Sequence, residues 1–232
     1  QVRAATAGCE QRIHFNNAGA ALPTRSTLER VTAYLQREAE IGGYEAAREA
    51  SDEIESVYQS IADLVHASPA DIALMESSTR AWDAIFYSIP FQPGERIVTG
   101  RSEYASNYIA MLQVARRYGV DIEVIEDDEH GQVDLDQLSS SLDDTVRLVA
   151  LTWCPTSNGL INPALEVGEI LQAHRAWYLL DACQAVGQLP VDVAGLQCDF
   201  LTATGRKFLR APRGTGFLYV RPELYQQIEP SQ

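Results

Sequence analysis

The sequence predicts an α/β protein with a mostly parallel sheet that helices cover on both faces. Two observations lead to this prediction. Short, continuously apolar runs recur through much of the chain, and segments with the apolar spacing of amphipathic helices separate them. A chain of 232 residues that is 46% hydrophobic can also bury the core of one large domain. We therefore expect strands and helices to alternate along the chain.

The N-terminal part is predicted to be a loop followed by helices. Residues 13–23, IHFNNAGAALP, combine a short apolar piece with small residues, which favours an extended segment and then a loop. A helical pattern begins at Thr24, directly after a proline. A second helix is predicted through residues 54–65, where apolar residues recur every three or four positions.

The rest of the chain shows the alternation itself. The candidate strands are 72–75, 97–100, 122–125, 146–153, 177–181, 199–203 and 216–220. The candidate helices are 79–89, 104–118, 134–142 and 164–175, and a further helix is expected to begin in RPELYQQI, residues 221–228. No internal repeat or low-complexity segment interrupts this order.

Small, polar and charged residues directly follow five of the candidate strands. The segments are ESSTRAW, RSEYASN, CPTSNG, DACQ and TGRK, in chain order. In open α/β sheets, ligands bind outside the carboxyl ends of the strands, in the loops that lead into helices. The sequence therefore predicts one site to which five strand ends contribute.

The charge balance excludes two classes of partner. The formal net charge is −14, whereas nucleic acids and anionic membranes both attract clustered Lys and Arg. The sequence also contains no basic and apolar leader and no long apolar run, so neither a signal peptide nor a membrane span is predicted. We expect a soluble protein that binds neither nucleic acid nor membrane.

The cysteines favour a reducing compartment and no metal. Cys9, Cys154, Cys183 and Cys198 are scattered, and no C-x-x-C pair or histidine at metal-ligand spacing accompanies them. We therefore predict a cytoplasmic protein without a zinc site.

Common cofactor and catalytic motifs are missing or incomplete. RGTGFLY has Tyr219 in place of the third glycine of a dinucleotide fingerprint, and it leads into a strand instead of a helix. The sequence has no Walker A, H-E-x-x-H or G-x-S-x-G motif. Nucleotide, zinc-protease and common serine-hydrolase chemistry are therefore disfavoured.

Pyridoxal phosphate needs a lysine, an acid for its pyridine nitrogen, a phosphate site at a helix start and a flat side chain over the ring. Asp181 ends an apolar strand, where a pyridinium would give a buried carboxylate its partner, although a helix cap or turn is the commoner role there. Residues 77–79 open a helix whose free amides favour phosphate, although one of them is expected simply to be the N-cap. Lys207 follows another apolar strand.

Together these motifs resemble the class V aminotransferases, a family of fold-type I pyridoxal phosphate enzymes that includes cysteine desulfurases, selenocysteine lyases and isopenicillin N epimerase-like proteins. The resemblance runs from FNNAGAALP to RGTGFLYV, and its most specific part is the ordered set D-A-C-Q, T-G-R-K and R-G-T-G. The gap from Asp181 to Lys207, 207 minus 181 or 26 residues, also suits the family.

The resemblance implies a domain organisation. Residues 24–232 would form the cofactor-binding large domain, with a mostly parallel seven-stranded sheet, and residues 1–23 would be an N-terminal segment that approaches the substrate. The smaller C-terminal domain of the family would be absent, so the chain is expected to be truncated.

The resemblance also implies roles for individual residues. Lys207 would form the Schiff base and move protons, Asp181 would bind the pyridine nitrogen, and Tyr104 would stack on the ring. The remaining implied contacts are Ser78, Thr79, Thr204 and Arg206 for the phosphate, Gln184 and Asn158 for the phenolic oxygen, and Asn16 and Asn17 for the substrate.

The activity implied is transamination or carbon-sulfur cleavage of an amino acid, with epimerisation left open, in an enzyme that is expected to be a homodimer. The alternative is a cofactor-binding fragment or remnant without turnover. A longer reading frame with an arginine downstream would favour the enzyme, and a genuine stop after Gln232 would favour the remnant.

Overall fold

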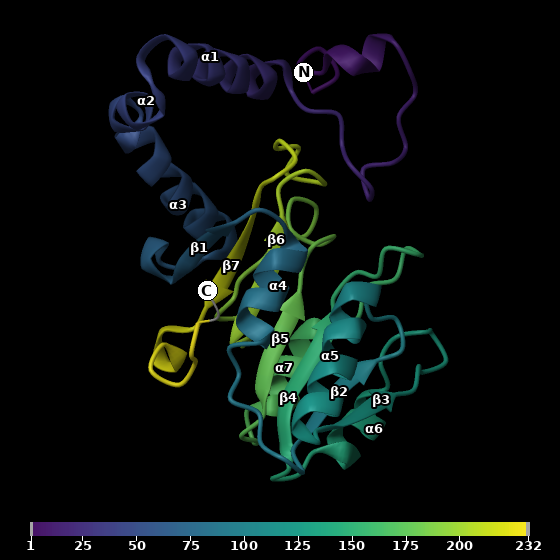
Figure 1. Ribbon diagram of the computed structural model, residues 1–232. Coiled ribbons are helices and arrows are strands. Elements are labelled where there is room, and N and C mark those ends of the chain that lie inside the picture. Colours follow the sequence, from purple (N-terminus) through teal and green to yellow (C-terminus); the bar gives the residue numbers. More distant parts are fainter. Residues whose placement is uncertain (1, 231–232) are drawn as a thin grey trace.

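One seven-stranded sheet organises the protein in the computed structural model, which describes residues 2–230. The strands are β1 Ile72–Met75, β2 Arg96–Gly100, β3 Asp121–Ile125, β4 Val146–Thr152, β5 Trp177–Asp181, β6 Phe200–Thr204 and β7 Gly216–Val220. They lie in the order β1-β7-β6-β5-β4-β2-β3 (Figure 1). Strands β3, β2, β4, β5 and β6 are parallel, and β7 runs antiparallel to both of its neighbours, β6 and the edge strand β1. The predicted mostly parallel sheet is confirmed.

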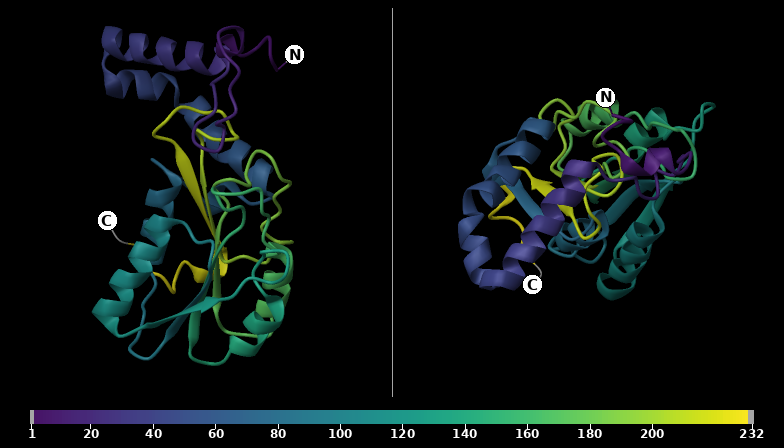
Figure 2. Two further views of the ribbon diagram at one scale, coloured as in Figure 1. Left: turned by 90° about the vertical axis from the view of Figure 1, so that its right-hand side faces the viewer. Right: turned by 90° about the horizontal axis from the view of Figure 1, so that it is seen from above.

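Helices cover both faces of the sheet, as predicted (Figure 2). The helices are α1 Arg25–Ile41, α2 Gly43–Glu49, α3 Ser51–Val65, α4 Ser78–Phe86, α5 Ala105–Tyr118, α6 Leu135–Ser141 and α7 Ala164–Leu171, and short 3-10 turns span Ala7–Glu10, Pro69–Asp71 and Pro222–Leu224. Helices α4 and α5 pack on one face, and α6, α7 and the end of α3 pack on the other.

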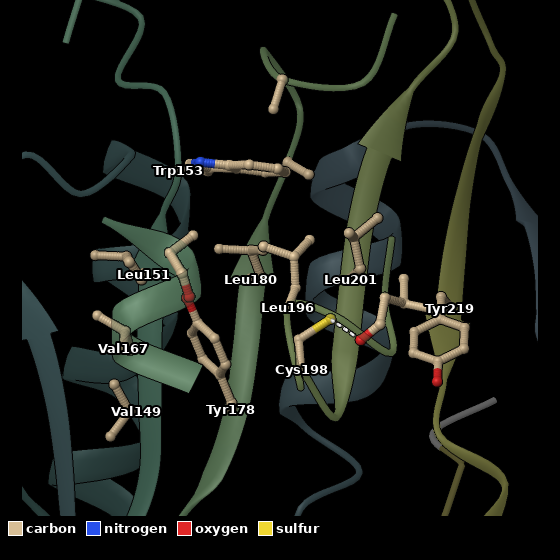
Figure 3. Close-up of a cluster of buried hydrophobic side chains, with 14 of the residues drawn as sticks. Val149, Leu151, Trp153, Val167, Tyr178, Leu180, Leu196, Cys198, Leu201 and Tyr219 are labelled. Atoms are coloured by element: carbon tan, nitrogen blue, oxygen red, sulfur yellow. Dashed lines mark hydrogen bonds between the residues drawn. The ribbon is translucent and has the colours of Figure 1, made fainter. Parts of the chain in front are cut away.

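The alternation of side chains along the central strands builds two separate cores. Leu179 of β5 lies with Trp82 and Phe86 of α4 on one face, whereas its neighbours Tyr178 and Leu180 point to the other face. Figure 3 shows this second core, where Tyr178 and Leu180 pack beside Val167 of α7. Because both faces are covered, the central strands are apolar throughout and their ends are fixed in space.

Helices α1 and α2 project beyond the sheet (Figure 1). No residue of α1 is buried, and the chain breaks between α1 and α2 at Gly42, which adopts a φ of 99° that favours glycine. Apolar spacing predicted α1 but not α2, and it could not show that the apolar side chains of α1 stay exposed. Among the described residues, no helix combines the length and apolarity that crossing a membrane requires.

Several element ends differ from the predictions by one to three residues, α4 ending at Phe86 instead of residue 89, and two segments differ more. Helix α7 ends at Leu171, four residues before the predicted end, and turns follow it. The helix expected in residues 221–228 is only the 3-10 turn Pro222–Leu224 followed by further turns. Both segments have apolar spacing, but neither has enough buried surface to extend the helix.

Candidate functional site

A pocket at the carboxyl ends of the parallel strands brings together most of the predicted site residues. Its volume is about 420 Å³ including its open mouth. Every one of the five predicted strand ends contributes to it. The lining residues are Ser78, Thr79, Tyr104, Thr152, Cys154, Thr156, Asp181, Cys183, Gln184, Arg206 and Lys207.

Asp181 is fixed at the end of β5 by neutral donors. Its side chain is only 5% exposed, one carboxyl oxygen accepts from the Cys183 amide at 2.9 Å, and the other accepts from Asn107 Nδ2 at 2.9 Å. Burial raises the pKa of this carboxyl, while these hydrogen bonds and the nearby Lys207 ammonium act against the shift. The carboxyl is thus held in a defined position but is only partly neutralised.

Lys207 reaches the same pocket from the turn after β6. The residue is only 6% exposed, and its ammonium interacts with Asp181 and with the Cys183 thiol. The turn is held tightly: a Cβ on Gly205 would lie 2.2 Å from Thr215 Oγ1, so glycine is required where T-G-R-K packs against R-G-T-G. This packing directs the lysine inward.

The start of α4 forms one wall of the pocket. Ser77 is the N-cap, because its Oγ accepts from the Arg80 amide at 3.1 Å, while Ser78 and Thr79 line the pocket. A Cβ on Gly216 would lie 2.8 Å from the carbonyl carbon of Ser77, so the first residue of β7 lies directly against the helix start. Free amides and the positive end of a helix dipole favour an anion at this wall.

Arg206 adds a cation beside the helix start. Its Nη1 donates to Thr204 Oγ1 at 3.0 Å, and Thr204 Oγ1 donates to the Thr215 carbonyl at 3.2 Å. Thr204 is buried and does not line the pocket, so the structure makes it a support for Arg206. The Ser78 hydroxyl likewise donates to Thr202 Oγ1 at 3.3 Å, inside the protein. The pocket therefore offers an anion the amides of α4, the Thr79 hydroxyl and one guanidinium.

The structure does not bring Asn158 into this pocket. The residue is exposed, and its Oδ1 accepts from the Leu160 amide at 3.1 Å, so the side chain turns back on its own loop. Thr156 lines the pocket instead and accepts from Gln184 Nε2 at 2.9 Å. The buried Gln184 Oε1 has no hydrogen-bond partner within residues 2–230, which leaves an acceptor free for a ligand.

Tyr104 lies at the mouth of the pocket, 42% exposed, as the residue before α5. Asn16 and Asn17 are also exposed, and they do not line the pocket; Asn16 Oδ1 accepts from the Gly19 amide at 3.1 Å. The main chain of their loop does reach the site, because the Ala18 carbonyl accepts from Gln184 Nε2 at 3.1 Å and the Ala21 amide donates to the Arg206 carbonyl at 2.9 Å.

Sequence reasoning missed a second carboxyl behind the pocket. Glu103 and Asp181 both accept from Asn107 Nδ2 at 2.9 Å. Burial, together with the negative charge of Asp181, raises the pKa of Glu103 to about 7. The available signal was the acidic residue in RSEYASN, the segment that directly follows a buried strand, but the same letter is also usual on a solvated loop.

Comparisons with known proteins agree with the geometry. The family model described as "Aminotransferase class-V" matches residues 13–232. A probable cysteine desulfurase of Methanothermobacter thermautotrophicus is 31% identical over 189 residues, which are 82% of this chain and 47% of that protein. A cysteine desulfurase of Dickeya dadantii is 35% identical over 187 residues, which are 78% of this chain and 45% of that protein. The chain thus spans about half the length of these relatives.

Solved structures share the fold. The apo cysteine desulfurase of Thermococcus onnurineus NA1 superposes with a TM-score of 0.91 at 26% identity, covering 99% of this chain and 58% of that one. A lysine-to-alanine mutant of C-DES, described with glycine covalently linked to its PLP cofactor, gives a TM-score of 0.93 over 99% of this chain and 62% of its own. At 22% identity, this second likeness shows the fold alone.

Proposed function

The chain belongs to the class V aminotransferase family, and from that premise we propose that it is the cofactor-binding part of an enzyme that acts on an amino acid through pyridoxal phosphate. The observation that carries this proposal is one pocket in which Lys207, Asp181 and the start of α4 converge. Among the family's reactions, carbon-sulfur cleavage is favoured over transamination, because curated relatives at 31% and 35% identity are named as cysteine desulfurases.

The side chains present suit this cofactor. When bound, pyridoxal phosphate supplies an electron sink for cleavage of a bond near the amino group of the substrate. Asp181, a buried carboxyl with only neutral hydrogen-bond donors and one lysine, gains a full partner from a protonated pyridine nitrogen. The orphaned Gln184 Oε1 and the anion-binding wall at α4 complete the match at the other edges of the pocket.

Each residue is assigned a proposed role on this basis. Lys207 attaches the cofactor through its amine and carries the proton that leaves or joins the substrate carbon. Asp181 keeps the pyridine nitrogen protonated, and Tyr104 covers the ring face. Ser78, Thr79, Thr204 and Arg206 form the phosphate site, in which Thr204 acts by orienting Arg206. Gln184 Oε1 accepts a hydrogen bond from the phenolic oxygen in its protonated form, and the Thr156 hydroxyl, in place of Asn158, can donate to that oxygen.

The N-terminal segment is proposed to border the substrate. Residues 1–23 would form this border and 24–232 the cofactor-binding domain, with Asn16 and Asn17 available to the amino acid. Gln184 links the two parts, because its amide binds the Ala18 carbonyl on one side and Thr156 on the other.

A second copy of the chain is the proposed partner. A groove of about 1900 Å³ including its open mouth lies between α3, α4 and the turns around residues 205–216, and much of its lining is apolar. Apolar side chains also stay exposed on the projecting helices: Leu28, Val31 and Leu35 on α1, and Ile54, Val57 and Leu64 on α3. Exposed apolar surface of this extent favours association.

The four cysteines are free thiols, which suits the cytoplasm proposed from their spacing.

The sequence allows an unambiguous chemical test of the cofactor site. Lys207 is the only lysine in the chain, so any pyridoxyl lysine must be this residue. The purified protein is incubated with pyridoxal phosphate, reduced with borohydride and mapped by peptide mass spectrometry. We expect one adduct at Lys207 and none in Lys207→Ala, in which only the N-terminal amine remains. Unlabelled wild-type protein would contradict the proposal.

Turnover separates an enzyme from a cofactor-binding remnant. Cysteine, cystine and alanine are offered to the loaded protein while the visible absorbance of the cofactor is followed. We expect cysteine or cystine to bleach or shift this band and to release sulfide. A band that no amino acid of a broad panel perturbs would support the remnant instead.

A further inference from the structure

A hydrogen-bond network centred on the half-buried Glu103 lies directly behind the pocket. The Glu103 carboxyl accepts from the Tyr104 amide at 2.7 Å, from Asn107 Nδ2 at 2.9 Å, from Thr99 Oγ1 at 3.2 Å and from Thr152 Oγ1. These four donors come from β2, from β4 and from the start of α5. A carboxyl bound from three elements has little freedom to move.

Asn107 connects this carboxyl to the pocket. It is only 1% exposed, and its Nδ2 donates one hydrogen to Glu103 Oε1 and the other to Asp181 Oδ2, both at 2.9 Å. The opposite amide orientation would place Asn107 Oδ1 against two carboxyl groups, so Glu103 fixes which end of the amide faces Asp181. Ser106 Oγ, 3.4 Å from Asn107 Oδ1, supports the same orientation from the other side.

Glu103 also holds the residue on the other side of the ring site. It accepts from the main-chain amide of Tyr104, whose side chain lines the pocket mouth. An ordinary helix cap would bind the free amides of the first turn of α5, whereas Glu103 binds the amide before the helix and hydroxyls of two strands. Capping alone therefore does not explain these contacts.

We propose that Glu103 is a positioning residue for the cofactor: through Asn107 and the Tyr104 amide it holds the carboxylate at the pyridine nitrogen and the aromatic over the ring. The proposal rests on the proposed function. It requires the acceptor oxygens of Glu103 and not its charge, so an isosteric amide should replace it. The charged and titratable groups around the pair are Lys207, Arg206, Cys154 and Cys183, all on the pocket side of Asp181.

The test compares two substitutions that differ only in hydrogen bonding. Glu103→Gln keeps an acceptor oxygen for Asn107 and Tyr104, whereas Glu103→Leu removes every acceptor at similar size. The dissociation constant of pyridoxal phosphate and the visible circular dichroism per bound cofactor are measured. We expect Glu103→Leu to weaken binding at least tenfold and to reduce the dichroism, while Glu103→Gln stays within about twofold of the wild type.

Asp199→Asn is the matched control, because Asp199 is a buried carboxyl at the opposite end of the same sheet. It should lower the melting temperature but leave the dissociation constant and the dichroism unchanged. If Glu103→Leu does not fold, Asn107→Ala cuts the link with Glu103 still present, and the same tenfold loss is expected.

Three results would overturn the proposal. They are wild-type binding and dichroism in folded Glu103→Leu, wild-type values in Asn107→Ala, and an equal loss in Asp199→Asn. A wild-type protein that binds no cofactor would overturn the proposed function together with this inference, whereas normal wild-type binding with an unaffected Glu103→Leu variant contradicts the role of Glu103 alone.

Discussion

The carboxyl groups packed at the two ends of the sheet have different kinds of partner. At the amino end, Asp199 accepts from the Tyr178 amide at 2.6 Å and forms an ion pair with Arg221. At the carboxyl end, the hydrogen-bond donors of Asp181 and Glu103 are amides and hydroxyls, and among the described residues Lys207 is the cation that acts on Asp181. The amino end pairs its carboxyl with an arginine, although burial still raises the pKa of Asp199, whereas the carboxyl end holds two carboxyl groups against one lysine.

This difference indicates which end is built for a ligand. Buried charges without a partner lower stability, and natural proteins accept that cost mainly where function requires it. If Lys207 is used to attach a cofactor, its own positive charge no longer offsets Asp181, and a protonated pyridine nitrogen takes over that part. The amino end has Arg221 as the partner of its carboxyl and needs no ligand for that purpose.

Breaking the ion pair at the amino end should have the largest effect. Arg221→Ala leaves Asp199 buried with only the Tyr178 amide as its donor, and we expect the free energy of unfolding to fall by about 3 kcal/mol. Urea unfolding of the cofactor-free protein at pH 8 measures this change. Arg213→Ala, in an exposed loop, is the control and should change stability little. Equal losses in the two variants would remove the contrast between the ends.

Removing a charge at the carboxyl end should instead raise the free energy of unfolding. The pKa of Glu103 is raised from about 4.5 to about 7, so Glu103 is protonated in both folded and unfolded chains below pH 4.5 and carries no penalty there. As the pH rises towards 7, only the unfolded chain releases the proton, and stability falls until the folded chain ionises too. Glu103→Gln should therefore add about 2 kcal/mol at pH 8 and nothing at pH 4.5.

Urea unfolding of cofactor-free protein at several pH values checks this prediction. Glu169→Gln removes an exposed carboxyl on α7 and should leave the pH dependence unchanged. The pH dependence of the free energy of unfolding that remains in Glu103→Gln comes partly from Asp181, because burial also raises the pKa of that carboxyl. A destabilised Glu103→Gln variant at pH 8 would mean that the charge itself holds this end together.

The sequence predicted the fold and the convergence of the site well, because both follow from strand periodicity. Continuous runs of apolar residues indicate buried strands. The residues that follow such strands, including Asp181 and Lys207, must lie together at one edge of a parallel sheet. The structure brings both into one pocket. Their catalytic and binding roles stay predictions.

Side-chain direction in the loops was beyond sequence reasoning. Asn158 was favoured for its amide, but a local hydrogen bond to the Leu160 amide turns it away, and Thr156 points inward instead. Glu103 went unnoticed because burial of a loop carboxyl depends on donors that lie far apart in the sequence, such as Thr152, which is 49 positions away. Such contacts depend on tertiary packing, which residue patterns do not encode locally.

The smallest expected effect tests whether neutral donors stabilise the carboxyl end. Thr99, which is buried in β2, donates to Glu103 Oε2 at 3.2 Å, and Thr99→Val removes that hydroxyl while keeping the shape of the side chain. We expect a loss of about 1 kcal/mol at pH 8, where the carboxylate is ionised, and a smaller loss at pH 4.5. In the Glu103→Gln background the loss should also shrink, because a neutral acceptor binds a hydroxyl less strongly than a carboxylate does. A loss that is the same at both pH values and in both backgrounds would show that Thr99 contributes through packing alone. Neutral donors would then stabilise the Glu103 carboxylate less than the ion pair with Arg221 stabilises the Asp199 carboxylate.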